Sequence, residues 1–129
     1  MELGSKFVSQ RFMLTGPKKT KWVEHEHVVE TKKDILCKTL CSAISPGTEL
    51  AAFQGAKSLS GRAIYPRVNG YMNIAVVLDV CEGVSALKPD DIVLTFNCHE
   101  SHFVVREDNI LVKLNDRSKI EKFVFAYAY

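Results

Sequence analysis

The chain has 129 residues, of which 47% are apolar and 25% are charged, so it is long enough to form one domain with a core of its own. It carries 17 basic and 15 acidic residues, and this even balance gives no reason to expect nucleic acid or an anionic membrane as a partner. The densest basic cluster comprises Lys18, Lys19 and Lys21, which we expect at the solvated tip of a hairpin.

The sequence has no apolar stretch near the ~20 residues that a membrane span needs. Residues 1–16 also contain no apolar run long enough for a secretory signal. Four cysteines are spread along the chain without a Cys-x-x-Cys pair, which indicates reduced thiols. These features predict a soluble, cytoplasmic protein.

Residues 7–14 and 22–30 are rich in strand-forming side chains and are separated by a Gly-Pro turn signal, so they predict a β-hairpin. His25 and His27 fall on one face of its second strand. Two imidazoles are too few for a metal site, and we expect both histidines to be exposed at a sheet edge.

Residues 35–44 form the most strand-like run in the chain. A short helix is predicted next, over residues 48–54, with Ser45 or Thr48 as its cap and Gly55 as its stop. The loop before this helix therefore places a hydroxyl and a carboxylate on the first helical turn.

Further short strands follow at intervals of about ten residues, a spacing typical of β-barrels and sandwiches. They are predicted over residues 73–80, 92–96, 101–106 and 110–114. Since only one small helix separates the strands, the pattern favours an all-β fold.

The last segment has the pattern of a capped amphipathic helix, with Ser118 at the N-cap and Glu121 three residues later. Its apolar residues fall on one helical face: Ile120, Phe123, Val124 and Tyr127. So much apolar surface on a short helix leads us to expect that residues 120–129 pack against a further partner.

Several motifs in order resemble one known family. They are residues 35–50, the pattern Tyr65-Pro66-x-x-x-Gly70-Tyr71, residues 77–84 and residues 87–93. Together they look like the N-terminal GroES-like catalytic domain of medium-chain dehydrogenase/reductases, in the zinc-alcohol-dehydrogenase-like subgroup with a Ser-Pro-Gly-Thr-Glu loop. The resemblance implies a single domain over residues 1–129, a partly open β-barrel with one or two short helices and a C-terminal helix.

Zinc-dependent members of this family bind the metal through a Cys in this loop and a His in a Gly-His-Glu motif. Here the gapless alignment puts Pro46 at the Cys position and Tyr71 at the His position. Proline has no donor atom, and Ser or Tyr hydroxyls are weak Zn²⁺ ligands beside Cys and His. The resemblance therefore predicts no family-type metal site.

Two glycines of the family pattern are also replaced, by Cys81 and by Asp90. Asp is the better substitute, because it can enter the left-handed backbone region. Cys81 predicts either a relaxed backbone or a bulge that differs from the family.

The group Cys98-His99-x-x-His102 leaves three interpretations open. In the first, His99 lines an active-site cleft, since the family often carries a polar or His residue near that position. The three side chains could instead hold a metal ion, or Cys98 and His102 could have ordinary structural places.

The resemblance implies a parent enzyme that transfers hydride between NAD(P)H and a small carbonyl, alcohol or enone substrate. In that enzyme Thr48 would donate or relay a proton to the substrate oxygen, and Tyr71 would hydrogen-bond the same oxygen. Glu49 would orient the loop, and His99 would line the wall of the cleft.

The family binds its nicotinamide cofactor on a following Rossmann domain, which is marked by a Gly-rich turn. The 129 residues contain no Gly-x-Gly, so we expect this chain to bind no cofactor and to be inactive alone. Residues 120–129 would then contact a separate cofactor-binding domain or mediate homo-oligomerisation. The alternatives are a stand-alone, non-catalytic barrel that binds a partner or itself, and a truncated gene product.

Overall fold

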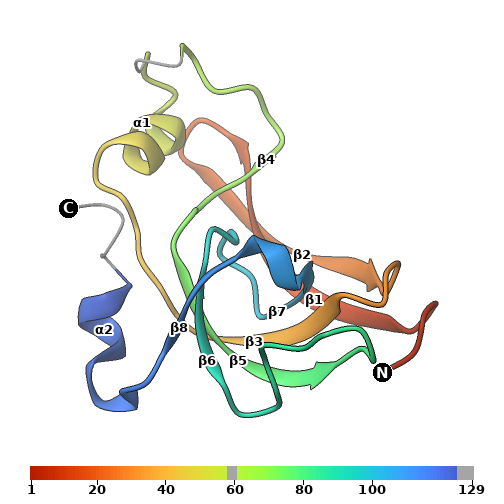
Figure 1. The fold of residues 1–129 in the computed structure, drawn as a ribbon. Coiled ribbons are helices and arrows are strands. Elements are labelled where there is room, and N and C mark those ends of the chain that lie inside the picture. The colour runs from red at the N-terminus through yellow and green to blue at the C-terminus, as the bar shows by residue number, and fades with distance from the viewer. Residues whose placement is uncertain (58–60, 125–129) are drawn as a thin grey trace.

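The computed structural model describes residues 1–57 and 61–124, and most of these residues lie in antiparallel strands (Figure 1). The strands are β1 (Lys6–Gly16), β2 (Lys19–Val28), β3 (Asp34–Ser42), β4 (Arg67–Val68), β5 (Asn73–Val80), β6 (Ile92–Thr95), β7 (His102–Arg106) and β8 (Ile110–Leu114). The helices are α1 (Thr48–Gln54), α2 (Ile120–Phe123) and two 3-10 turns, η1 (Glu107–Asn109) and η2 (Arg117–Lys119).

The strands form two open sheets, with the order β2-β1-β4 in one and β7-β3-β5-β6-β8 in the other. Every strand pair described is antiparallel. The prediction of a mainly-β, GroES-like fold with few helices is confirmed, and the sheets do not close into a complete barrel. None of the described helices is both long enough and apolar enough to cross a membrane.

The five-stranded sheet carries apolar side chains on both faces, which explains why residues 73–80 read as a nearly continuous apolar run. One face packs around Phe103, together with Ile35, Cys37, Ala75, Val77, Leu87 and Val93. The other face packs around Met72, together with Ala43, Ile74, Ile92, Leu94 and Val124. Successive residues of a strand point to opposite faces, so neighbours such as Ile74 and Ala75 enter different clusters.

Helix α2 covers the second of these clusters. Val124 is 1% exposed, and Ile120 and Phe123 pack against the same cluster while remaining partly exposed. This part of the predicted apolar helix face therefore packs on the protein's own sheet and is not left for a partner. Phe125, Tyr127 and Tyr129, which the same prediction included, lie outside the described residues.

The predicted helix caps are only partly confirmed. Helix α1 ends at Gly55, whose φ of 71° is left-handed, as expected for a glycine stop. Its N-terminus has no side-chain cap, so the assignment of Ser45 or Thr48 to that role is wrong. The Ser118 cap is also wrong, because α2 begins after Lys119 and Asp116 accepts a hydrogen bond from the Ser118 N–H.

Two other local predictions are confirmed, and a third, for His27, is wrong. Asp90 has a φ of 76°, so it does occupy the left-handed region that the replaced glycine would favour. The lysines of the β1–β2 turn are exposed, as predicted. His27 is not an exposed edge residue, since its ring lies 2.7 Å from a buried carboxylate and its side chain is 13% exposed.

That carboxylate belongs to Glu100, and it joins the two sheets. The Ser9 hydroxyl on β1 and the Asn97 amide donate to it, and the Arg11 side chain pairs with it at 3.2 Å. Backbone bonds join the same segment to both sheets, from the Phe12 N–H to the His99 carbonyl and from the Thr39 N–H to the Ser101 carbonyl.

Burial alone would raise the pKa of Glu100, but hydrogen bonds from His27, Ser9 and Asn97 outweigh it and lower the pKa from 4.5 to about 2. The charged form is therefore the one that the fold stabilises. Removing one member of a buried ion pair leaves the remaining charge buried without an opposite charge, which destabilises the fold.

We predict that Glu100→Gln lowers the free energy of unfolding by about 3 kcal/mol, because Arg11 loses its buried counter-charge and the hydrogen bonds to the carboxylate, including that with His27, are disturbed. Urea unfolding at neutral pH measures the loss. Glu82→Gln is the control, since Glu82 pairs with Lys32 at the exposed surface and its loss should cost under about 1 kcal/mol. Equal costs for the two variants would contradict a structural role for the buried carboxylate.

The pH dependence follows from the depressed pKa. The contribution of Glu100 is fully present above pH 4.5 and is lost as the pH falls towards 2. The stability of the unmodified chain should therefore decline through this window, and Glu100→Gln should lack that part of the decline. Parallel profiles would show that other carboxylates cause the acid sensitivity.

Candidate functional site

The centre of the candidate site is a hydrogen-bonded pair formed by Glu49 and His99. Glu49 stands on the first turn of α1, and His99 lies in the segment between β6 and β7, yet His99 Nε2 is 2.5 Å from Glu49 Oε1. Both side chains are nearly excluded from solvent, with 2% and 10% of their surfaces exposed. A buried carboxylate and imidazole at this distance can hold or exchange a proton.

Each member of the pair has a second partner that fixes its orientation. The Ser45 N–H donates to Glu49 Oε2, so the carboxylate closes the loop that precedes α1. On the other side of the imidazole, His99 Nδ1 lies 2.7 Å from the Ser42 hydroxyl at the end of β3. The three side chains form one continuous hydrogen-bonded chain, Ser42–His99–Glu49.

Gly70 makes room for the imidazole. Its φ is +99°, and a Cβ at this position would lie 2.8 Å from Cδ2 and Nε2 of His99. The His99 N–H also donates to the carbonyl of Asn69, the neighbour of Gly70. The extended segment before β5 therefore holds the His99 ring by a backbone bond and by the absence of a side chain.

A cavity of about 220 Å³ opens beside the pair. Besides Glu49 and His99, its lining residues are mostly apolar, with Thr20 and Asn69 as the polar exceptions: Phe12, Leu14, Thr20, Ile44, Leu50, Phe53 and Asn69. Phe12 meets the His99 ring edge to face, with 6.1 Å between the ring centroids. Such a cavity suits a small, uncharged ligand whose one polar atom faces the ionisable pair.

The four residues predicted for the site do not all meet there. The structure brings Glu49 and His99 together, which no spacing in the sequence could establish. Thr48 is exposed and lines a different hollow, on the other side of α1. Tyr71 packs against the apolar cluster around Met72. The catalytic roles of all four residues remain predictions.

Sequence reasoning missed two residues of the site. Ser42 reads as an ordinary strand residue, and nothing local connects it with a histidine 57 positions later. Gly70 belongs to a quoted motif, but its closeness to the His99 ring depends on the tertiary fold. The glycine in that motif was the one available signal for a close approach.

The donor chemistry near the loop does not suit a zinc ion. Pro46 and Tyr71 hold the positions of the family's metal ligands, and Tyr71 packs among apolar side chains. Over residues 1–57 and 61–124, no three His, Cys, Asp or Glu side chains gather as a metal site would require.

A nicotinamide dinucleotide does not fit the described residues either. Its family-type site needs parallel strands with a helical crossover, and all the strand pairs described here are antiparallel. The described residues therefore form no family-type dinucleotide site.

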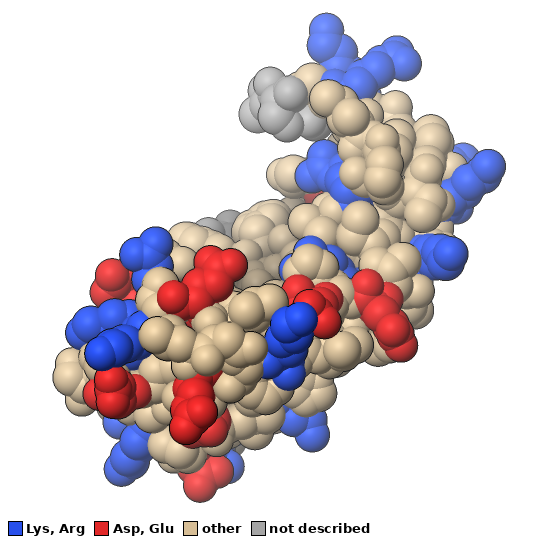
Figure 2. All heavy atoms as spheres, turned by 90° about the vertical axis from the view of Figure 1, so that its right-hand side faces the viewer, with Lys and Arg blue, Asp and Glu red and all other residues tan. Residues whose placement is uncertain are grey.

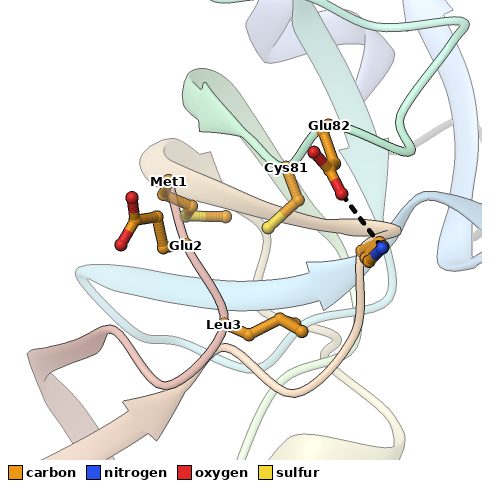
Figure 3. A pocket seen from close by; sticks show the side chains of 6 residues that line it. Met1, Glu2, Leu3, Cys81 and Glu82 are labelled. Carbon is orange, nitrogen blue, oxygen red and sulfur yellow. Dashed lines mark ion pairs between the residues drawn. The ribbon is translucent and has the colours of Figure 1, made fainter.

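A separate hollow of about 330 Å³ lies near the N-terminus, far from α1 (Figure 1), and Figure 3 shows Cys81 pointing into it beside the Lys32–Glu82 ion pair. Cys81 is 3% exposed, and burial raises the pKa of its thiol. The neutral thiol is a poor nucleophile, so this hollow is a less suitable candidate for a reactive site than the cavity beside Glu49 and His99.

Several solved structures share this architecture. An enoyl thioester reductase from Candida tropicalis matches 91% of this chain with a TM-score of 0.63 and 19% identity. A quinone oxidoreductase from Coxiella burnetii matches 84% with a TM-score of 0.62 and 20% identity. The chain has the GroES-like fold. CAD from Helicobacter pylori, solved with NADP(H), matches 92% with a TM-score of 0.68 and 15% identity.

These neighbours are medium-chain dehydrogenase/reductases, and the chain spans 36%, 38% and 44% of their respective lengths. No protein-family model matches the chain, and no curated protein does. At such low identity the likeness establishes the fold, while activity has to be argued from the site.

We predict that Gly70→Ala lowers the free energy of unfolding by more than the cost of placing an alanine at a positive φ. The additional cost arises because the new methyl group would displace the His99 ring. Gly4→Ala is a matched control, since Gly4 has a φ of +85° and open space around it. Urea unfolding should show that Gly70→Ala costs about 1–3 kcal/mol more than Gly4→Ala. Altered NMR signals of the His99 ring in the first variant alone would confirm the cause, and equal costs would contradict it.

Proposed function

We propose that this chain is the substrate-side, GroES-like part of a zinc-independent, NAD(P)-dependent oxidoreductase of the medium-chain family. The observation that carries the proposal is the Glu49–His99 pair at the wall of an apolar cavity, within the fold of such enzymes. The substrate class is a small, uncharged carbonyl, alcohol or enone.

The chain's own residues would bind the substrate and transfer a proton to or from its oxygen. The aromatic and aliphatic wall excludes water, which strengthens polar interactions inside the cavity. A carbonyl oxygen placed beside Glu49 and His99 would meet the only ionisable side chains among the described residues that line this cavity. Ser42, at the half-buried end of the hydrogen-bonded chain, would connect the pair to solvent.

The hydride donor would have to be supplied by a separate nucleotide-binding domain. Large apolar side chains remain exposed around α1, with Ile44 at 69% and Leu50 at 44%, and both also line the cavity. A second domain that covers this face would close the cavity and bury these side chains. This supports a partner on the α1 side, whereas the described part of the 120–129 segment packs on the protein's own sheet.

The ligand prediction can be tested by NMR titration of the purified chain with cyclohex-2-enone. We expect shifts at Phe12, Phe53 and His99, which line the cavity. Leu50→Arg should weaken the binding about tenfold or more, because it places a charge at an apolar wall. Leu40→Arg is the control, since Leu40 is also 44% exposed but lies outside the cavity.

Absence of shifts at these residues with enone, aldehyde and alcohol probes alike would overturn the proposed substrate role. The same conclusion would follow if Leu50→Arg and Leu40→Arg had equal effects. The two arginine variants should unfold at similar urea concentrations, which separates a local effect from a loss of the fold.

A second prediction concerns activity. The 129-residue chain incubated with NADPH or NADH and crotonyl-CoA, a quinone or an aldehyde should oxidise no cofactor above the blank, since residues 1–57 and 61–124 form no parallel-stranded, family-type site for the dinucleotide. Absorbance of the reduced nicotinamide measures this directly. Turnover by the purified chain would contradict the need for a separate nucleotide-binding domain.

A further inference from the structure

The charged residues are segregated between the two ends of the molecule. Residues 12–21 and 43–71 carry six cationic side chains and a single acid, the buried Glu49: Lys18, Lys19, Lys21, Lys57, Arg62 and Arg67. The rest of the chain holds the other 11 basic and 14 acidic residues. Figure 2 shows blue side chains dominating the upper end and both colours mixed over the lower end.

Tertiary contacts bring these two segments together. The Lys18 N–H donates to the Phe53 carbonyl, so the β1–β2 turn sits against α1. Tyr65 donates its hydroxyl proton to the Ala52 carbonyl, and β4 pairs with β1 at Met13 and Leu14. The overall charge of +2 hides this asymmetry, because the acids of the other end cancel most of it.

A hollow of about 250 Å³ lies within this basic end, and two arginines line it. Arg62, Arg67 and Thr48 line this hollow. The other lining residues include the small residues Ala56, Gly61 and Ala63. No carboxylate belongs to the described lining. The volume is below that of a typical drug-sized pocket, so the hollow suits one end of a ligand.

Neither arginine is neutralised by a neighbour. Among residues 1–57 and 61–124, no carboxylate forms an ion pair with Arg62 or Arg67, and Arg67 makes only a long bond of 3.4 Å to the Val68 carbonyl. Glu49 is close in sequence, but both its oxygens are engaged, by Ser45 and His99. No described acidic side chain therefore neutralises either arginine of the hollow.

We propose that this hollow binds a phosphate group, either free inorganic phosphate or the phosphate of a nucleotide. Guanidinium groups match phosphate oxygens in charge and in fork geometry, and the Thr48 hydroxyl adds a donor. The surrounding lysines raise the local concentration of anions. The small residues leave space for a phosphate to approach the backbone. This site is independent of the substrate-binding and proton-transfer role proposed for Glu49 and His99.

Isothermal titration of the purified chain with inorganic phosphate, adenosine 5′-phosphate and adenosine tests the proposal at low salt. Both phosphate compounds should bind and adenosine should not. Arg62→Gln and Arg67→Gln should each weaken binding about tenfold or more, as expected when a charge-assisted hydrogen bond is removed. Tighter binding of the nucleotide than of phosphate would identify a nucleotide as the source, and equal affinity would identify the free ion.

The matched control is Lys19→Gln, which removes one charge from the same end of the molecule but not from the wall of the hollow. It should change the affinity less than either arginine variant. All three side chains are at the surface, so the variants should keep the unfolding midpoint of the parent. The proposal is overturned if neither phosphate compound binds, or if Lys19→Gln weakens binding as much as the arginine variants do.

Discussion

The structure depends on one buried carboxylate, that of Glu100, which contacts Arg11 and His27 of the β1–β2 hairpin and is hydrogen-bonded within its own segment. Residues 98–101 form a bridge between the two sheets, through backbone hydrogen bonds to β1 and β3 and an isolated β-bridge between Arg11 and Glu100. A buried ionic group is costly to desolvate, and it is tolerated here because its oxygens have several partners. Its position therefore determines how the hairpin sits against the five-stranded sheet.

The same segment places the candidate site. His99 directly precedes Glu100, and its backbone bonds to Phe12 and Asn69 hold it between β1 and the segment that joins β4 to β5. The side chain is then directed at Glu49 and Ser42, which come from α1 and from the end of β3. The sheet junction and the ionisable pair are thus parts of one hydrogen-bonded structure. A change in the junction would move the imidazole that faces the cavity.

The basic end of the molecule also arises from contacts between segments that are distant in the sequence. Two segments that are far apart in the chain meet at α1, and both are rich in lysine and arginine. The sequence shows each segment separately, with an overall balance close to neutral. Only their juxtaposition creates a basic end that holds a hollow lined by Arg62 and Arg67.

The sequence by itself determined the mainly-β fold, the run of short strands, helix α1 with its glycine stop and the left-handed Asp90, because periodicity and turn chemistry are local properties. It also supplied Glu49 and His99 as candidates through a family resemblance. Only the tertiary structure decided that these two meet, that Ser42 and Gly70 complete their surroundings, and that Thr48 faces another hollow. It likewise decided that His27 binds a buried carboxylate and that Val124 packs inward. Contacts between residues far apart in the chain depend on how the sheets pack, and no local pattern encodes that packing.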